Sequence, residues 1–269
     1  MNKYKLEEPF VVSFSGGRTS GFMLRNIMDA HGGIPTGSHV CFANTGKEHP
    51  KTLDFVREID ERWKVGIVWI ERVFDETKFR VVDHASCSRN GEPFAAMNAK
   101  KKFLPNPIMR FCTSELKVLA IAYYLKSLGV TQATMAIRLR ADEPRRFHKV
   151  QGDVRNGFDS DCPVARAGHT IADVTEFWKA QPFDLMLPND DRAFGNCDLC
   201  FLKGRSMTER VIRHDPSSAD WWIEQEQLVG GTFRKDRPNY AGLLHQVRIQ
   251  PELFEVNDDD STVPCGCTD

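Results

Sequence analysis

Long apolar runs are missing from this sequence, and no segment approaches the roughly 20 consecutive apolar residues that a membrane-spanning helix requires. The first ten residues, MNKYKLEEPF, lack the apolar core of a signal peptide. Internal repeats and low-complexity segments are also missing, so nothing indicates a repeat architecture. We therefore expect a cytoplasmic protein without a membrane partner.

A large excess of charge of either sign is missing too, since the formal net charge of the 269-residue chain is −1. Overall electrostatics therefore gives no reason to expect nucleic acid as a partner. Two stretches are locally basic, residues 100–102 and residues 138–149. Such stretches are most often solvated faces, and phosphate binding is the alternative hypothesis.

Cysteine, in contrast, is well represented, and the eight cysteines of a cytoplasmic protein are more often metal ligands or redox groups than disulfide partners. Cys197 and Cys200 form a CxxC pair in GNCDLCFLKG, and thiols at this spacing can reach one metal or cluster iron. Cys112 in RFCTSELK is expected at the start of a helix beside basic residues, which favours its thiolate. Cys265 and Cys267 lie in a polar tail.

The other cysteines carry less information. Cys41 is expected to be structural because it falls in a predicted buried strand, whereas Cys87 and Cys162 fall in loops and suit either role. Three or four thiolates from separate segments suit an iron–sulfur cluster, and a zinc site would use the same ligands.

The alternation of short apolar runs with helical patterns over the first 140 residues predicts parallel βαβ units. We expect an α/β fold with a doubly wound, mostly parallel five-stranded sheet and a smaller helical, cysteine-bearing C-terminal lobe. The predicted domains are residues 1–160 and 161–269. The predicted strands are 9–14, 39–43, 66–70 and 133–137, and the predicted helices are 21–30, 50–63, 113–128, 206–214 and 217–229. Residues 71–110 break the pattern and are expected to be a long functional connection, and a polar tail is expected after residue 229.

The segment Ser13–Ser20, SFSGGRTS, lies between the first predicted strand and the first predicted helix. Its glycines allow an anion to approach bare backbone N–H groups at the positive end of a helix dipole. The Walker loop has a longer glycine spacing and an adjacent Lys-Ser/Thr pair, so this is a different loop. The segment predicts a phosphate cradle, with a ligand-free turn as the alternative.

Two further polar segments follow predicted strands. Asn44-Thr45-Gly46, with Glu48 nearby, suits an adenine or ribose edge, although a turn with a helix cap is the alternative. Arginine guanidinium groups bind phosphate or sulfate in a bidentate manner, and a salt-bridged loop is the alternative for this stretch. The candidate arginines are Arg138, Arg140, Arg145 and Arg146. Because ligands bind at the carboxyl ends of parallel strands, we expect these segments to meet at one sheet edge.

Six motifs in this order resemble the phosphoadenosine phosphosulfate reductase-like branch of the PP-loop (adenine nucleotide α-hydrolase) superfamily: SFSGGRTS, FANTGKEH, RFCTSELK, RLRADEPRR, DVTEFW and GNCDLCFLKG. The resemblance implies ATP and Mg²⁺ as ligands and, as in many relatives, a [4Fe–4S] cluster, with zinc as the alternative. The implied nucleotide-binding residues are Ser13, Ser15, Gly16, Gly17, Arg18, Thr19, Ser20, Asn44, Thr45, Gly46 and Glu48. The implied cluster ligands are Cys112, Cys197, Cys200 and Cys267, with Cys265, Cys87, Cys162 or an open iron site as alternatives for the fourth position.

Two departures separate the chain from assimilatory sulfonucleotide reductases. Their phosphate loop is degenerate, whereas SGG and Ser20 are intact here, and their Glu-Cys-Gly-Ile-His tail motif is replaced by VPCGCTD. Arg18 stands where many PP-loops have lysine.

The preferred hypothesis is ATP-dependent sulfur transfer through adenylation of a nucleic-acid or nucleotide acceptor, with a cysteine desulfurase or another protein as sulfur donor. Arg138, Arg145 and Arg146 would hold the acceptor phosphate, and Arg140 is a further catalytic candidate. The cluster or a tail cysteine, Cys265 or Cys267, would carry sulfur. Thiol-dependent reduction of adenylyl sulfate or its 3′-phosphate is the first alternative. The second alternative is a non-catalytic nucleotide- or nucleic-acid-binding regulator. A homodimer is compatible with each hypothesis.

Overall fold

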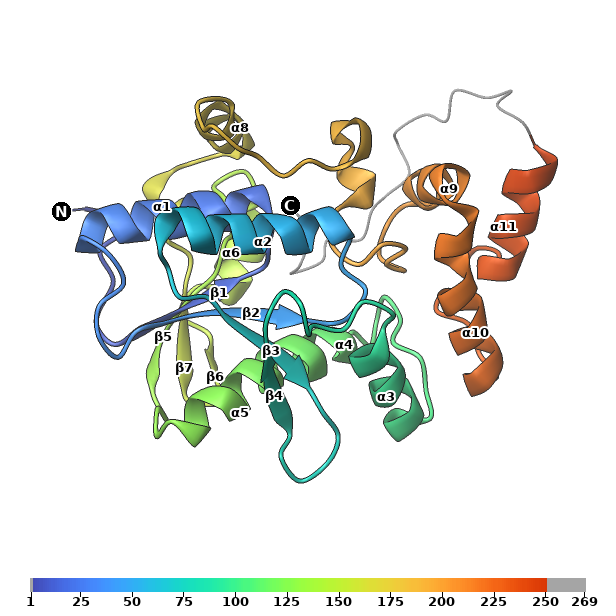
Figure 1. The fold of residues 1–269 in the computed structure, drawn as a ribbon, viewed down its shortest axis with the longest axis horizontal. Coiled ribbons are helices and arrows are strands. Elements are labelled where there is room, and N and C mark those ends of the chain that lie inside the picture. Colours follow the sequence, from blue (N-terminus) through green and yellow to red (C-terminus); the bar gives the residue numbers. More distant parts are fainter. Residues whose placement is uncertain (1, 251–269) are drawn as a thin grey trace.

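A seven-stranded sheet lies at the centre of the computed structural model, which describes residues 2–250 (Figure 1). The strands are β1 (Phe10–Phe14), β2 (His39–Asn44), β3 (Val68–Arg72), β4 (Phe79–Val82), β5 (Ala133–Ala136), β6 (Val154–Arg155) and β7 (Phe158–Asp161). Their order is β4-β3-β2-β1-β5-β7-β6. Only β4 and β6 pair antiparallel, and they form the two edges.

The expected α/β class with a mostly parallel sheet is confirmed, but the expected number of five strands is wrong. The edge strands β4 and β6 are short, and most of their residues are exposed or half-buried. Apolar runs reveal a strand only where the core covers it, so exposed edge strands give no such pattern. β7 has the sequence FDSD, in which only Phe158 is apolar, so it gives no apolar run either.

The period of two along β1 assigns its side chains to opposite faces of the sheet. Phe10, Val12 and Phe14 join the cluster that contains α1 (Arg18–His31) and α2 (Pro50–Trp63). Val11 joins a second cluster on the other face, with α5 (Ala120–Ser127). Figure 1 shows α1 and α2 along one face of the sheet and α5 on the other. The sheet is therefore covered by helices on both faces.

The remaining helical segments lie between and after the strands. They are α3 (Glu92–Lys101), α4 (Phe111–Thr113), the π-helix η1 (Ser114–Leu119), α6 (Pro144–Val150), α7 (Pro163–Ala167), α8 (Ile171–Lys179), η2 (Pro188–Asp190), η3 (Arg192–Phe194), α9 (Arg205–His214), η4 (Pro216–Ala219), α10 (Asp220–Val229) and α11 (Tyr240–Ile249). Within residues 2–250, no helix has both the length and the apolar character needed to cross a membrane.

Three expectations about elements are corrected. The segment 71–110 holds β4 and α3, and residues 240–249 of the expected polar tail form α11. α1 begins at Arg18 and not at residue 21, because Gly17 occupies the N-cap position and bonds to Ser20. A glycine-rich stretch is a weak helix former, so its helical start is visible only from the cap geometry.

A third hydrophobic cluster contains the C-terminal helices and the segment around Cys197 and Cys200, which we call the cysteine loop. Trp222, Phe233 and Tyr240 are fully or almost fully buried in it, together with Phe94 and Met97 from α3. α8 belongs instead to the cluster over the sheet, where Trp178 packs on Phe55 and stacks on Trp63. The division of the chain at residue 160 stays a prediction.

Candidate nucleotide site at the β1–α1 loop

The loop between β1 and α1 makes a tight turn that leads directly into the helix. Gly16 has a φ of +80°, and a Cβ atom at this position would lie 2.8 Å from Cγ2 of Thr52. The Gly17 N–H donates to Ser20 Oγ at 3.1 Å, and Ser20 Oγ donates back to the Gly17 carbonyl at 2.8 Å. These bonds fix the start of a 14-residue helix whose first N–H groups have no partner within the helix. The loop therefore has the geometry of an anion cradle.

Two arginines that follow β5 support this loop. Arg138 Nε donates to Ser15 Oγ at 2.9 Å, and Arg140 Nη1 donates to Thr19 Oγ1 at 3.3 Å. Both arginines are buried, at 2% and 8% exposure. Arg140 is also paired with Asp142 at 3.0 Å. The predicted meeting of the first loop with the arginine stretch thus occurs at the carboxyl ends of the neighbouring strands β1 and β5.

A cavity of about 310 Å³ opens over the loop. Its lining residues come from two parts of the chain. One part is the β1–α1 loop with Thr52, Arg140 and Asp142, and the other, called the α8 wall, is α8 and the segment after it. The lining residues of that wall are Ile171, Val174, Thr175, Leu185, Leu187, Asp190, Arg192, Gly195 and Asn196. The lining carries three arginines and two aspartates, so its side chains have a formal charge of +1.

The α8 wall is not predicted from the sequence. Its residues reach the loop because α8 packs on α1, where Trp178 Nε1 donates to the Arg18 carbonyl at 2.8 Å. The contact joins residues 160 positions apart, and no local motif marks such a contact. DVTEFW in α8 was recognised only through the family resemblance.

Arg18 ties the cradle to that wall. Its guanidinium forms a bidentate pair with Asp184, with both bonds at 2.8 Å, and it also donates to Asp190. Because the fork is already bound to carboxylates, its charge is largely neutralised in this structure. Arg18 therefore lines the cavity as a link between two segments and not as an isolated cation.

Several predicted nucleotide-binding and catalytic residues lie outside the cavity lining. Ser13 lies in β1 opposite Cys41 of β2. Asn44 is fully buried, and its side chain donates to Glu71 at 2.6 Å and to the Ser88 carbonyl at 2.9 Å. Arg145 is exposed on α6, and Arg146 pairs with Glu143.

Thr45, Gly46 and Glu48 instead contact the cysteine loop and its surroundings. The Glu48 carboxylate accepts from the Thr45 N–H and hydroxyl, each at 2.9 Å, and Thr45 Oγ1 lies 3.6 Å from Cys197 Sγ. Glu48 also forms an isolated β-bridge with Cys197, and the Gly46 carbonyl accepts from the Gly91 N–H. The polar residues after β2 thus support the CxxC segment.

A buried lysine binds the backbone of the cysteine loop. Lys203 Nζ donates to the carbonyls of Ala193, Cys197 and Asp198 at 2.5, 2.8 and 2.6 Å. Burial lowers the pKa of the Lys203 ammonium from its ordinary value, and the nearby cysteines and aspartates act in the opposite direction. The Asp198 carboxylate pairs with Lys47 at 2.8 Å. A lysine next to a CxxC motif gives no sequence signal of such burial.

Cys112, Cys197 and Cys200 share the C-terminal hydrophobic cluster. Burial raises the pKa of the Cys197 thiol well above its usual value and Glu48 raises it further, whereas Lys117 lowers it. Within residues 2–250, no three His, Cys, Asp or Glu side chains are arranged around one metal ion. Cys265 and Cys267 lie outside the described residues. A four-iron cluster binds each thiolate through a different iron, so its ligands surround a larger body than one ion.

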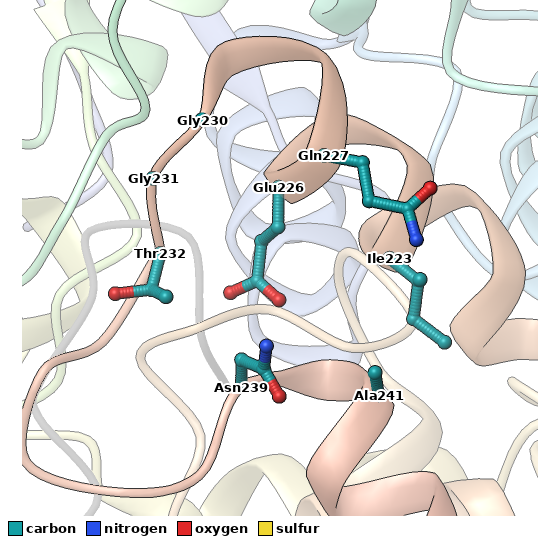
Figure 2. Close-up of a pocket in the computed structure, with 8 residues that line it drawn as sticks. All are labelled: Ile223, Glu226, Gln227, Gly230, Gly231, Thr232, Asn239 and Ala241. Carbon is teal, nitrogen blue, oxygen red and sulfur yellow. The ribbon is translucent and has the colours of Figure 1, made fainter.

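A second hollow, of about 260 Å³, lies between α10 and the start of α11 (Figure 2). The side chain of Glu226 points into it, but its carboxylate already accepts from the N–H groups of Phe233 and Tyr240 at 3.1 and 3.0 Å. Asn239, also in the lining, accepts from the Gly242 N–H and caps α11. The side chains of Glu226 and Asn239 therefore serve the fold.

No family model matches the chain. A search of curated proteins finds similarity to the uncharacterized nin region protein ORF290 of Escherichia phage lambda, at 32% identity over 202 residues. The match covers 72% of this chain and 66% of that protein. Among solved structures, a phosphoadenylyl-sulfate (PAPS) reductase from Candida auris, in a phosphate complex, matches 65% of this chain and 73% of its own, with 19% identity and a TM-score of 0.38. The identity and the TM-score of this structural match are too low to support a conclusion about activity.

Proposed function

We propose that this chain is an ATP-dependent enzyme that binds the nucleotide phosphates on the β1–α1 loop and cleaves ATP between the α- and β-phosphates. The observation that carries the proposal is the cavity itself, whose floor is the N-terminus of α1 and whose side holds Arg140. Backbone N–H groups and a guanidinium are the donors that phosphate oxygens require. Arg140 is paired with Asp142 and Glu143 in this structure, so phosphate would replace a carboxylate partner.

The proposed first step is attack by an acceptor oxygen on the α-phosphorus of ATP. A new P–O bond forms, the bond to the β-phosphate breaks, and diphosphate leaves with the electron pair. The N–H groups of the first turn of α1 and the Arg140 guanidinium would stabilise the charge that develops on the phosphates. Mg²⁺ would neutralise part of the phosphate charge, and Asp142 and Asp190 in the lining are the carboxylates that suit it.

In the second proposed step, the terminal sulfur of a cysteine persulfide attacks the adenylated atom of the acceptor, and AMP leaves with the electron pair of the broken bond. A second thiolate then attacks the carrier cysteine's sulfur in the resulting mixed disulfide. The transferred sulfur stays on the acceptor, and the two cysteines form a disulfide that an external thiol reduces. Support comes from chain continuity, because Gly195 and Asn196 line the cavity and Cys197 follows directly. A sulfur donor such as a cysteine desulfurase would supply the sulfur atom, and a nucleic acid or nucleotide would be the acceptor. The tail cysteines Cys265 and Cys267 stay candidates for carrying it.

Product analysis tests the first step. Purified protein with ATP, Mg²⁺ and a pool of RNA or DNA should release AMP and diphosphate. Arg140→Gln should reduce the rate by about a hundredfold, because a donor to the developing charge is lost, whereas Arg155→Gln, an exposed arginine on β6, should act as the wild type. Release of ADP and phosphate would overturn the proposal. Sulfite release from adenylyl sulfate with a thiol would identify a reductase, and tight ATP binding without product would identify a regulator.

The iron–sulfur cluster is a separate proposal, with Cys112, Cys197 and Cys200 as ligands from the described residues. The three cysteines lie in the same hydrophobic core of side chains, which supports this proposal. Protein purified without oxygen should be brown and contain about four irons per chain, and Cys197→Ser should remove both. A colourless protein that contains zinc would instead support the alternative metal.

A further inference from the structure

The connection between α3 and α4 presents apolar and basic side chains to the solvent. Ile108 is 92% exposed, Met109 49% and Phe103 44%, so three large apolar side chains face water within residues 103–109. Lys100 and Lys102, directly before them, are exposed as well. Single exposed apolar residues are common on protein surfaces, but a group of them beside charged residues is typical of an interaction site.

The connection is a closed turn whose backbone is fixed. Asn106 Oδ1 accepts from the N–H groups of Ile108 and Met109 at 3.0 and 2.9 Å, and the Asn106 N–H donates to the Met109 carbonyl at 3.1 Å. Leu104, which is 3% exposed, anchors the turn in the C-terminal hydrophobic cluster. Because the exposed side chains stand on an ordered backbone, a partner that binds them has little ordering entropy to overcome.

The charge of this segment has one sign. The sequence contains no aspartate or glutamate from residue 93 to residue 114, and the four charged residues of this range are all basic. Lys100 and Lys101 lie in the last turn of α3, where they complement the helix dipole, and Lys101 also pairs with Glu115 at 2.6 Å. The dipole explains basic residues at this end of α3, but it does not explain the exposed apolar side chains beside them.

Two phenylalanines of the segment lie close together. The ring centroids of Phe103 and Phe111 are 6.3 Å apart, and Lys101 Nζ lies 6.0 Å from the centroid of the Phe111 ring. These contacts join α3 to α4, which lie near each other in Figure 1. Unpaired bases stack on aromatic rings, and lysines neutralise the phosphates between them.

We propose that residues 100–111 form a docking surface for a single-stranded segment of nucleic acid, which serves as the acceptor. Phe103 would stack on a base, Ile108 and Met109 would contact neighbouring bases or sugars, and Lys100 and Lys102 would lie against phosphates. The role as acceptor rests on the proposed function, whereas binding of the strand does not.

Charge and size favour nucleic acid over a protein partner. A stable protein interface uses about 800 Å² of each partner around an apolar centre, which three partly exposed side chains on one turn do not supply. A single strand requires only rings and positive charge along its path.

The surface ends at a cysteine and is separate from the ATP cavity. Cys112 directly follows Phe111 and is half-buried, whereas Cys197 and Cys200 are buried. None of residues 100–111 lines the cavity over the β1–α1 loop. A strand on this surface would therefore lie beside the most accessible of the three proposed cluster ligands.

Fluorescence anisotropy of a labelled oligonucleotide tests the surface in the full-length protein without ATP. The probe is a mixed-sequence single strand of about 15 nucleotides, which the wild type should bind about tenfold more tightly than the duplex, because only unpaired bases stack. Lys100→Gln/Lys102→Gln should weaken binding about tenfold and lower the slope of log affinity against log salt by about 1.4, since each phosphate contact contributes about 0.7. Phe103→Leu should weaken binding about fivefold and leave the slope unchanged.

A matched variant controls for net charge. Lys126→Gln/Lys179→Gln removes two exposed lysines from the last turns of α5 and α8 and should bind the strand as the wild type does. An equal loss in this control and in Lys100→Gln/Lys102→Gln would overturn the surface, as would equal affinity for strand and duplex. Displacement of the strand by poly-L-glutamate at equal charge would assign the surface to an acidic protein and overturn the proposal too. Thermal unfolding of each variant near the wild-type temperature shows that the comparison concerns folded protein.

Steady-state kinetics separates the surface from the proposed function. Lys100→Gln/Lys102→Gln should raise the KM for the nucleic acid about tenfold and leave kcat and the KM for ATP unchanged. If the wild type binds the strand but converts ATP to ADP, the proposed function fails and the surface stands. If AMP and diphosphate are released but the wild type binds no strand, or the variants bind it as tightly as the wild type, the surface alone fails.

Discussion

Gly16 is the position in the cradle with the least freedom to change. Its φ of +80° disfavours any residue with a Cβ, and that Cβ would lie 2.8 Å from Thr52 Cγ2 and 3.0 Å from Val56 Cγ2. We expect Gly16→Ala to lower the free energy of unfolding by about 2–3 kcal/mol, since strain and overpacking add. ATP binding should be lost as well, because the loop must shift. Denaturant unfolding and calorimetry measure the two effects.

Gly37 is a matched control for this prediction. It has a similar φ of +85°, but an added Cβ would meet nothing within 4 Å. Gly37→Ala should therefore cost about 1 kcal/mol through backbone strain alone and leave ATP binding unchanged. Equal losses of stability in the two variants would show that the contact with α2 does not limit the loop.

Lys203 gives a second prediction for a single residue. Lys203→Met removes the donor to three carbonyls around the cysteine loop, although it also removes a buried charge. We expect a net loss of about 2 kcal/mol in the free energy of unfolding. Cys197 and Cys200 should react faster with a thiol reagent, because their loop opens more often. Lys126→Met, at an exposed lysine of α5, serves as the control. An unchanged thiol reaction rate in Lys203→Met would contradict a positioning role.

Whole elements differ in how much of them the sequence reveals. The bounds of α2 were predicted as found, because Pro50 suits the first helical position and Leu53, Val56 and Ile59 follow a helical period. β4 was missed because it is an edge strand with little burial. In the site, SFSGGRTS predicted the loop, since its turn and helix start are local. The α8 wall was not predicted, because it depends on packing between residues more than 150 positions apart.

The junction of α10 and α11 gives a prediction for pH. Burial raises the pKa of the Glu226 carboxyl above its ordinary value, while its bonds to the Tyr240 and Phe233 N–H groups act the other way. The folded state thus holds the proton more tightly than the unfolded state. The contribution of this group to stability is fully present below about pH 4.5 and is lost as the pH rises through the raised pKa.

The measurement compares the wild type with Glu226→Gln, whose side chain does not titrate. The unfolding free energy of the wild type minus that of Glu226→Gln should fall as the pH rises from about 4 to about 7. Glu224→Gln, an exposed change on the same helix, corrects for the general effect of removing one negative charge. A difference that grows with pH would reverse the assigned sign.

At the scale of the whole molecule, the cavity joins parts that are distant in the chain. Its floor belongs to residues 15–19, while residues 185–196 form its far wall and continue into the cysteine loop. Arg18 already connects the two segments through Asp184 and Asp190. Ligand binding in the cavity should therefore stabilise both the β1–α1 loop and residues 185–196. Through residues 185–196 it should also stabilise the CxxC segment.

Hydrogen exchange measures this coupling directly. At an ATP concentration of 100 times its Kd, binding should add about 2.7 kcal/mol to the stability of any segment that must open for the nucleotide to leave. Amide exchange should then slow in residues 15–20 and 185–196 together, and also around Lys203, whose amine holds the Cys197 carbonyl. Protection by ATP confined to residues 15–20 would mean that the far wall closes the cavity only in the free protein, and the nucleotide site would then be independent of the cysteine loop.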